Sequence, residues 1–221
     1  MTSKETYRQV EVLIAMTLVE MLLQAVQFAD KEEVMSTEKV LFESKWLSVI
    51  EKTLDNGGRY LFTRADWCNS KGVAILPYRF NEDKGVEFLG RYEHHPSYSD
   101  NLELGAIMGG MDKEGEEPVV TAWRELIEEG GCKVPIENIF SLGKSRPSKS
   151  TDNLMYLFAV CLDDGFEKVE ATGDGSLVEE GGYSKWIDLG ELIESDEPLL
   201  QSMYVRLAFR KTDEFIKRLS S

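Results

Sequence analysis

The hydrophobic pattern at the start of the chain predicts one long helix over residues 5–33. Polar side chains recur there at alternating spacings of three and four residues, at Thr17, Glu20, Gln24, Gln27 and Lys31. This spacing forms one narrow stripe on a helix and leaves most of the circumference apolar. We therefore expect the helix to be covered by the rest of the protein or by a second subunit. The longest unbroken apolar run, residues 12–16, is far shorter than the roughly 18 residues of a membrane span, so no membrane partner is expected.

From Glu38 onward the pattern changes to short β-prone runs that are separated by turn residues. Before residue 100 these runs are 39–54, 59–65, 72–80 and 86–94. An Asn-Gly-Gly turn separates the first two, and a loop that suits a hairpin separates the last two. Later strand-like runs are 139–144, 154–162 and 183–189.

Two further segments are predicted to be helices. Residues 117–130 form the first, and residues 197–219 form the second, which opens with the start signals Asp196 and Pro198. Strands with interspersed helices are typical of the α/β (α+β) class, here a mixed β-sheet sandwiched between helices. The N-terminal helix is expected in addition to this core.

Composition and charge narrow the choice of environment and partner. The 221 residues suit one globular domain with an appendage. The three cysteines lie far apart, so neither a structural zinc site nor a disulfide framework is predicted, and a reducing cytoplasm is the expected location. The net charge of −15 repels phosphate backbones, so a nucleic-acid partner is not expected. An anionic substrate would need a local reversal of the electrostatic field.

The helix predicted over residues 117–130 carries a row of carboxylates. Glu125, Glu128 and Glu129 are spaced at i, i+3 and i+4, which places them on one face within mutual reach. A solvated face is the simpler interpretation, but apolar residues such as Leu126 indicate that this helix packs against a core. Clustered carboxylates near a core need compensation, which a hard divalent cation such as Mg²⁺ supplies. Such an ion would give this acidic protein a positive site for an anionic substrate.

Proline and glycine residues bracket this helix. Pro118 falls in the first turn, where a missing N–H costs little, and the Gly109-Gly110 pair allows close approach of the backbone. Gly130-Gly131 ends the helix abruptly, as is typical of a left-handed cap. The sequence therefore predicts a loop, helix, loop unit that presents the carboxylate row.

Residues 110–132 resemble the signature of the Nudix hydrolase family, G-x5-E-x7-R-E-U-x-E-E-x-G-U, in which U is a bulky apolar residue. The matched residues are Gly110, Glu116, Arg124, Glu125, Leu126, Glu128, Glu129 and Gly131, with Cys132 at the last apolar position. The resemblance implies a Nudix-type fold and an ion pair between Glu116 and Arg124 that braces the loop. The family hydrolyses nucleoside diphosphates that are linked to another moiety, X.

The resemblance also implies a metal site. Glu125, Glu128 and Glu129 would hold Mg²⁺ or Mn²⁺, with the Gly109 carbonyl as a further ligand. In this chemistry water attacks one phosphorus of the diphosphate, and the metal neutralises charge on the phosphoryl oxygens.

A carboxylate must also orient or deprotonate the attacking water. The candidates are the three glutamates of the helix and a glutamate of a later loop, Glu180 or its neighbour Glu179. A solvated loop is the simpler interpretation of this pair.

Features outside the signature resemble the ADP-ribose pyrophosphatase branch of the family. Pro147 lies 15 residues after the end of the signature, and the strands within residues 38–66 resemble the small N-terminal antiparallel sheet through which those enzymes dimerise. The resemblance implies a homodimer, with an N-terminal helix and dimerisation sheet over residues 1–66 and a Nudix hydrolase domain over residues 67–221. Arg91 and Tyr92 lie where that branch supplies substrate contacts, although a surface role is the simpler interpretation of Arg91.

These features together predict a Mg²⁺-dependent pyrophosphohydrolase that acts on a small-molecule nucleoside diphosphate derivative. ADP-ribose or a similar ADP-X compound would give AMP and a phosphorylated X. One alternative is the hydrolysis of nucleoside triphosphates or RNA caps. Another alternative, of a different class, is a non-catalytic nucleotide-binding sensor. Every metal-binding carboxylate of the signature is present, which argues against a sensor.

Overall fold

A computed structural model describes residues 37–81, 85–163, 165–173, 175, 180–213 and 215. The helix predicted over residues 5–33 lies outside these residues. The chain divides into two compact units, one of residues 1–39 and 51–60 and the other of residues 40–50 and 61–221. The second unit contains all the candidate site residues. The predicted domain boundary at residue 66 stays a prediction.

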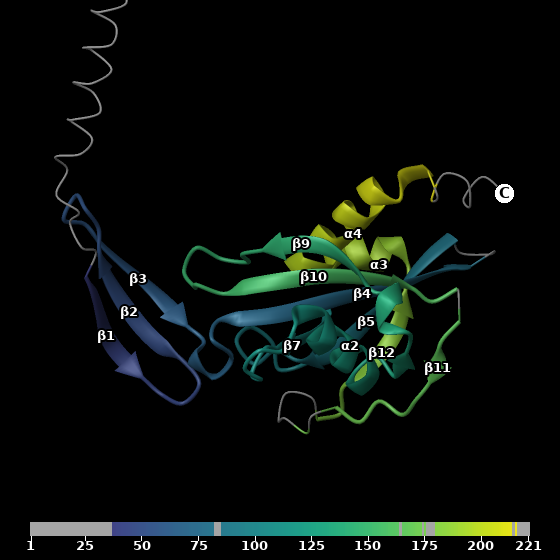
Figure 1. Ribbon diagram of the computed structural model, residues 1–221, viewed down its shortest axis with the longest axis horizontal. Helices are drawn as coiled ribbons and strands as arrows, with labels where there is room; N and C mark the ends of the chain where they lie inside the picture. Colours follow the sequence, from purple (N-terminus) through teal and green to yellow (C-terminus); the bar gives the residue numbers. More distant parts are fainter. Residues whose placement is uncertain are drawn as a thin grey trace, which may run out of the picture. The chain divides into compact units, whose positions relative to one another are not determined.

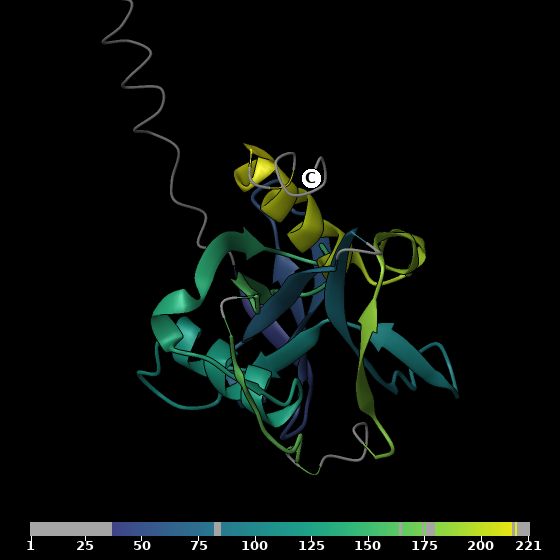
Figure 2. The same ribbon diagram turned by 90° about the vertical axis from the view of Figure 1, so that its right-hand side faces the viewer.

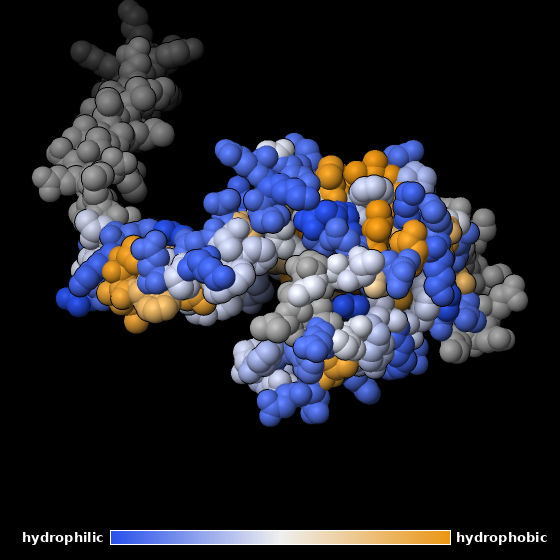
Figure 3. All heavy atoms as spheres, turned by 90° about the horizontal axis from the view of Figure 1, so that it is seen from below, coloured by the Kyte–Doolittle hydropathy of each residue, from blue (hydrophilic) through white to orange (hydrophobic). Residues whose placement is uncertain are grey.

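Three short strands form the small N-terminal sheet that the sequence predicts (Figure 1). They are β1 (Glu38–Glu43), β2 (Ser48–Thr53) and β3 (Arg59–Arg64), in that order. The run predicted over residues 39–54 is two strands, because the Ser44 hydroxyl accepts the Leu47 N–H and holds a turn between them. β1 is exposed along its whole length, including the apolar Val40 and Phe42, and Figure 3 shows apolar side chains gathered over this sheet.

The main sheet within the described residues has seven strands. They are β4 (Lys71–Asn81), β5 (Gly85–His94), β6 (Leu102–Gly105), β7 (Ile107–Gly110), β9 (Phe140–Ser145), β10 (Leu154–Cys161) and β12 (Tyr183–Ile187). The order is β12-β5-β4-β10-β9, with β6 paired to β5 and β7 paired to β4. The sheet is mixed, because β10 runs parallel to β4 while the other pairs are antiparallel. A separate small sheet pairs β8 (Cys132–Lys133) with β11 (Glu167–Lys168).

Helices cover both faces of the main sheet (Figures 1 and 2). α2 (Pro118–Glu128) packs on one face through the buried Ala122 and Leu126. α3 (Leu189–Glu194) and α4 (Pro198–Arg210) pack on the other face, where Leu200 and Met203 are buried. Two short 3-10 turns, η1 (Asp66–Cys68) and η2 (Ile136–Asn138), lie in the connections. This arrangement confirms the predicted α/β (α+β) class with a mixed sheet sandwiched between helices.

The C-terminal helix begins close to where the sequence predicts it. Glu197 is extended and its carboxylate accepts the Leu200 N–H at 2.7 Å, which caps the first turn of α4. α4 ends at Arg210, before the predicted end at residue 219, and residues 216–221 lie outside the described part of the chain. No helix among the described residues combines the length and hydropathy that crossing a membrane requires.

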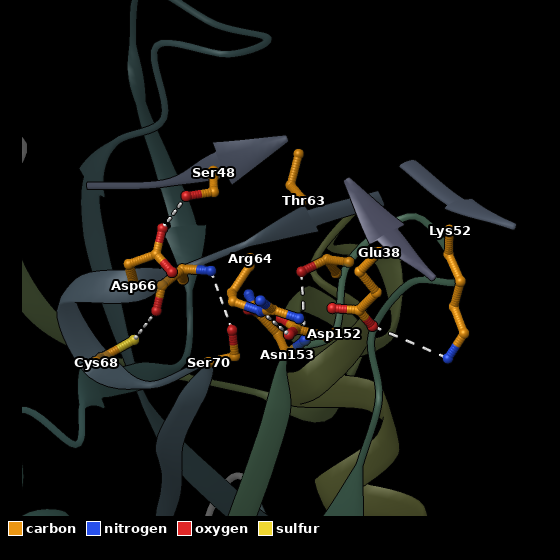
Figure 4. A network of polar contacts seen from close by, with 12 residues as sticks. Glu38, Ser48, Lys52, Thr63, Arg64, Asp66, Cys68, Ser70, Asp152 and Asn153 are labelled. Carbon is orange, nitrogen blue, oxygen red and sulfur yellow. Dashed lines mark hydrogen bonds and ion pairs between the residues drawn. The ribbon is translucent and has the colours of Figure 1, made fainter. Parts of the chain in front are cut away.

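Polar contacts hold the turn that leads from β3 into β4 (Figure 4). The Ala65 N–H donates to the Ser70 hydroxyl at 3.0 Å, while the Ser70 N–H donates to the Ala65 carbonyl at 2.9 Å. The Ser48 hydroxyl donates to Asp66, and Arg64 forms an ion pair with Asp152 at 3.1 Å. These contacts fix the start of β4, the strand on which β7 and α2 pack.

Candidate active site

α2 forms where the signature predicts a helix, and its ends follow from the same residues. Pro118 lies in the first turn, and Gly131 adopts a left-handed conformation with a φ of 62° just beyond the last turn. A side chain at Gly131 would be strained and would meet the Val169 carbonyl at 2.9 Å. The predicted loop, helix, loop unit is therefore present, and its apolar side fixes which carboxylates turn toward the sheet.

Glu125 lies against β7 because residue 109 is a glycine. A Cβ atom at Gly109 would come within 2.1 Å of the Glu125 Oε1 atom. The carboxylate therefore occupies the space that any other residue at this position would fill. Glu125 is only 6% exposed, so the strand and the helix together enclose an ionisable group.

Glu129 is a second buried carboxylate, 5% exposed, on the same side of the helix. Its Oε2 atom accepts the Met108 N–H at 3.3 Å. Burial is the largest cause that raises the pKa of Glu129, and with the nearby Glu93 and Glu125 it brings the pKa to about 9, although Arg91 and the Met108 N–H act in the opposite direction. This part of the site therefore has an excess of negative charge that its own residues do not neutralise.

Arg124 brings two of the predicted ligands together. Its Nη1 atom lies 3.0 Å from Glu125 Oε1 and 3.0 Å from Glu128 Oε2. The predicted pair with Glu116 is present at a longer distance, 4.0 Å from Arg124 Nη2 to Glu116 Oε2. The Thr121 hydroxyl donates to the same Glu116 oxygen at 2.7 Å, which ties the loop to the first turns of α2.

The carboxylate set fits a hard divalent cation in chemistry and in charge. Glu125 and Glu128 already converge on one cationic nitrogen, and the buried Glu129 is short of positive charge. Within the described residues no three His, Cys, Asp or Glu side chains are grouped so that they could hold a metal ion. The oxygens of these three glutamates instead contact Arg124 and the Met108 N–H. Ion binding would therefore require these side chains to turn from internal partners. The Gly109 carbonyl as a ligand stays a prediction.

Arg91 and Tyr92 lie on opposite faces of the sheet, because successive residues of a strand point in opposite directions. Arg91 is 4% exposed and its charge acts on Glu129, so it belongs to the α2 side. Tyr92 stacks on Tyr183, with ring centroids 5.1 Å apart, and packs against the core on the α4 side. Of the two predicted substrate contacts, only Arg91 is brought to the carboxylates, and both roles stay predictions.

Glu93 joins this site and was missed by sequence reasoning. Its Oε2 atom lies 3.7 Å from Arg91 Nε, and its charge is among the causes of the raised pKa of Glu129. Arg91 Nε is buried and donates no hydrogen bond to any of the residues that the structure describes. The alternation of a strand, which places residues i and i+2 on one face, is the signal that links Glu93 to Arg91.

The loop that carries Glu180 is tied to the end of α2 at two points. The Gly173 N–H donates to the Glu128 carbonyl at 2.9 Å, and the Ser184 hydroxyl donates to the Glu129 carbonyl at 2.7 Å. Glu180 is exposed between these two attachments, and Glu179 lies outside the described residues. The structure thus brings Gly173 and Ser184 to the end of α2, and it describes no contact of the Glu180 carboxylate with the site.

No model of a protein family matches the chain, and no curated protein matches it either. Among solved structures, the chain is similar to an ADP compounds hydrolase, with a TM-score of 0.57 and 18% identity over 80% of this chain and 93% of that one. It also matches a Nudix hydrolase from Nitrosomonas europaea, with a TM-score of 0.47 and 18% identity over 64% of this chain and 89% of that one. The Nudix domain of Shewanella oneidensis NrtR, complexed with ADP ribose, has a TM-score of 0.44 and 15% identity over 62% of this chain and 87% of that one. The chain has the Nudix fold, which confirms the resemblance seen in residues 110–132.

Mg²⁺ is expected to stabilise the protein more at high pH than at low pH. The pKa of Glu129 is raised from 4.5 to about 9, so the folded protein keeps a proton that the unfolded chain would lose. The contribution of Glu129 to stability is therefore full below its unfolded pKa and is lost as the pH rises toward its folded pKa. A bound cation favours the ionised carboxylate, so it relieves a cost that is present only at the higher pH.

Thermal unfolding with Mg²⁺ or with a chelator measures this effect. The rise in Tm on adding Mg²⁺ should be larger at about pH 8.5 than at about pH 6. Glu129→Gln should lose most of this difference. An equal rise at both pH values in the unmodified protein would contradict the charge deficit that we assign to Glu129.

Proposed function

We propose that this protein is a Mg²⁺- or Mn²⁺-dependent pyrophosphohydrolase that cleaves the diphosphate of a nucleoside diphosphate linked to another moiety. The observation that carries the proposal is the burial of the Glu125 and Glu129 carboxylates near the end of the signature helix, with Glu128 joined to Glu125 through Arg124. Burying a carboxylate with too little positive charge around it, as at Glu129, is costly, and a site that does so is a candidate for function.

The chain supplies binding and orientation for this reaction. Glu125, Glu128 and Glu129 would hold the cation, which when bound neutralises charge on the phosphoryl oxygens and increases the acidity of a water molecule. Arg91 would donate its Nε–H, which has no hydrogen-bond acceptor in the described part of the chain, to a phosphoryl oxygen. Its ion pair with Glu93 would keep the guanidinium aimed at the carboxylates.

Glu180 is the proposed group that orients or deprotonates the attacking water. Its segment is attached at Gly173 and Ser184 to the carbonyls of two of the proposed metal ligands. Glu180 is exposed between these two attachments, which supports a role for its carboxylate beside the proposed metal ligands. A carboxylate of α2 is the alternative, and Glu180→Gln distinguishes the two by its effect on turnover at saturating Mg²⁺.

ADP-ribose or a similar ADP-X compound is the proposed substrate, with AMP and a phosphorylated X as products. The resemblance to the ADP-ribose pyrophosphatase branch supports this choice, as does the similarity of the fold to that of an ADP compounds hydrolase. The net charge of −15 supports a small substrate over long RNA.

We further propose that the protein is a cytoplasmic homodimer that associates through the N-terminal sheet. β1 supports this proposal, because Val40, Leu41 and Phe42 are 53%, 46% and 55% exposed along one strand. Exposed apolar residues on an edge strand favour pairing with a second copy. Light scattering that finds a monomer at all concentrations would contradict it.

The experiment that tests the proposed function is an incubation with Mg²⁺ and a panel of ADP-sugars, dinucleotides and nucleoside triphosphates. Release of AMP together with ribose 5-phosphate from ADP-ribose is the expected result. Pyrophosphate release from triphosphates would move the assignment to that substrate class. Tight binding of the same compounds without turnover would identify a sensor and would overturn the proposal.

A further inference from the structure

The last carbonyl groups of α2 are satisfied by different parts of the chain. The Ile127 carbonyl accepts the Gly131 N–H at 3.2 Å, within the helix end itself. The Glu128 carbonyl accepts the Gly173 N–H at 2.9 Å, from the later loop that carries Glu180. The Glu129 carbonyl differs, because it accepts a side-chain hydroxyl, that of Ser184, at 2.7 Å. A helix end without such partners frays, so each of these bonds limits the freedom of the last turn.

Glu129 is the residue that gains most from this bond. It follows the last residue of α2 as the C-cap, with a φ of −103° and a ψ of −39°, so the helix holds it less firmly than Glu125. Its carboxylate is nonetheless buried and bonded to the Met108 N–H at 3.3 Å. The proposed reaction requires the Glu129 carboxylate in a defined place, although the helix itself holds this residue only at its end.

Ser184 connects this helix end to the strand that carries Arg91. Ser184 lies in β12 directly opposite Arg91 in β5. Tyr183 and Lys185 on either side of it are exposed, whereas Trp186, two residues on, packs against the core on the α2 side. The Ser184 hydroxyl, on the residue opposite Arg91, thus points to α2. Its hydrogen bond joins the backbone of Glu129 to the pair of strands β5 and β12.

We infer that Ser184 is a positioning residue, whose hydroxyl fixes the end of α2 on β12 so that the carboxylate of Glu129 lies beside the guanidinium of Arg91. The inference rests on the proposed function, in which these two groups bind the cation and the phosphoryl oxygens. Groups that act together on one reacting centre must be held to within roughly 0.5 Å. A hydrogen bond to the backbone of a ligand residue provides such support without contacting the substrate.

Ser184→Ala tests the inference, with Ser195→Ala as a matched control. The Ser195 hydroxyl donates to the Leu192 carbonyl at 2.8 Å, so it makes the same kind of bond at the end of α3, on the other face of the sheet. Calorimetric titration with Mn²⁺ and steady-state kinetics would be measured on both variants. We expect Ser184→Ala to weaken Mn²⁺ binding and to lower kcat by about tenfold each, with a smaller change in KM. Ser195→Ala should leave both quantities near those of the unmodified protein.

Two further variants separate positioning from folding. Ser184→Thr keeps the hydroxyl and should restore Mn²⁺ affinity and kcat, whereas Ser184→Cys replaces it with a weaker donor and should not. These two can be compared even where Ser184→Ala does not fold. The inference would be overturned if Ser184→Ala left Mn²⁺ affinity and kcat unchanged. It would also be overturned if the Thr and Cys variants had equal Mn²⁺ affinity and equal kcat.

The outcome also distinguishes this inference from the proposed function. Loss of Mn²⁺ affinity in Ser184→Ala, in a protein that hydrolyses no compound of the substrate panel, would reject the proposed reaction and retain Ser184 as a support of the cation site. If the unmodified protein hydrolyses a compound of the panel and Ser184→Ala has no effect, the proposed reaction is retained and the role of Ser184 is rejected.

Discussion

Glu129→Gln is expected to lower kcat by about 10²–10³-fold and, at the same time, to stabilise the metal-free protein above neutral pH. The amide removes a charge that the proposed cation needs, so turnover falls. It also removes a buried carboxylate whose pKa is raised to about 9 by burial and by Glu93 and Glu125. The folded protein therefore no longer bears the cost of ionising that group.

The two effects are measured separately, by steady-state kinetics with saturating Mg²⁺ and by thermal unfolding in chelator. A higher Tm in Glu129→Gln together with loss of turnover identifies a residue kept for function at the expense of stability. Glu137→Gln, a change at an exposed glutamate in η2, is the control and should alter neither quantity. Normal turnover in Glu129→Gln would contradict the role that we assign to this residue.

Gly109→Ala is expected to reduce kcat by about 10²-fold, although the change adds one methyl group. The new Cβ would come within 2.1 Å of Glu125 Oε1 and 2.2 Å of its Cδ. The carboxylate, or the helix that carries it, must therefore move. Overpacking of this kind costs about 1–3 kcal/mol of stability, so the fold survives while the proposed ligand is displaced.

Gly110→Ala is the matched comparison, because a Cβ there would meet the Trp67 ring at 2.1 Å. Trp67 is 46% exposed and can give way outward, and the neighbouring carboxylate is not touched. Kinetics and unfolding of both variants should show a similar loss of stability but a much smaller loss of kcat for Gly110→Ala. Equal losses of kcat would mean that crowding of β7, rather than displacement of Glu125, is the cause.

The helix of the signature could be predicted closely from the sequence. Pro118 at its start, Gly131 at its end and a strong 3.6-residue periodicity are local signals, and they act through backbone geometry alone. The predicted segment 117–130 therefore agrees with α2 to within two residues at either end.

β6 and β7 could not be predicted in the same way. Each is only four residues long, too short for an alternating pattern, and together they contain Gly105, Gly109 and Gly110. These glycines weaken a strand when considered by themselves. They are tolerated because β4, β5 and the packing side chains of the rest of the fold define the strand positions.

The arrangement of charges around the carboxylates also depends on the fold. Sequence spacing places Glu125 and Glu128 on one helix face, but only the packing of α2 on β7 buries the first and leaves the second partly exposed. The electrostatic effect of Glu93 on Glu129 links segments that are 36 residues apart in numbering, and no local pattern encodes it. The separation of Arg91 from Tyr92, by contrast, follows from strand alternation and could have been predicted.

The binding of a divalent cation by the carboxylates of α2 is tested most directly by titration with Mn²⁺, followed by electron paramagnetic resonance of the free ion. We predict that the unmodified protein removes Mn²⁺ from solution and that added Mg²⁺ releases it. A variant in which Glu125, Glu128 and Glu129 are all changed to Gln should fold and leave the Mn²⁺ free. The proposed site would be contradicted if the variant bound Mn²⁺ as tightly as the unmodified protein does. It would also be contradicted if the unmodified protein bound no Mn²⁺.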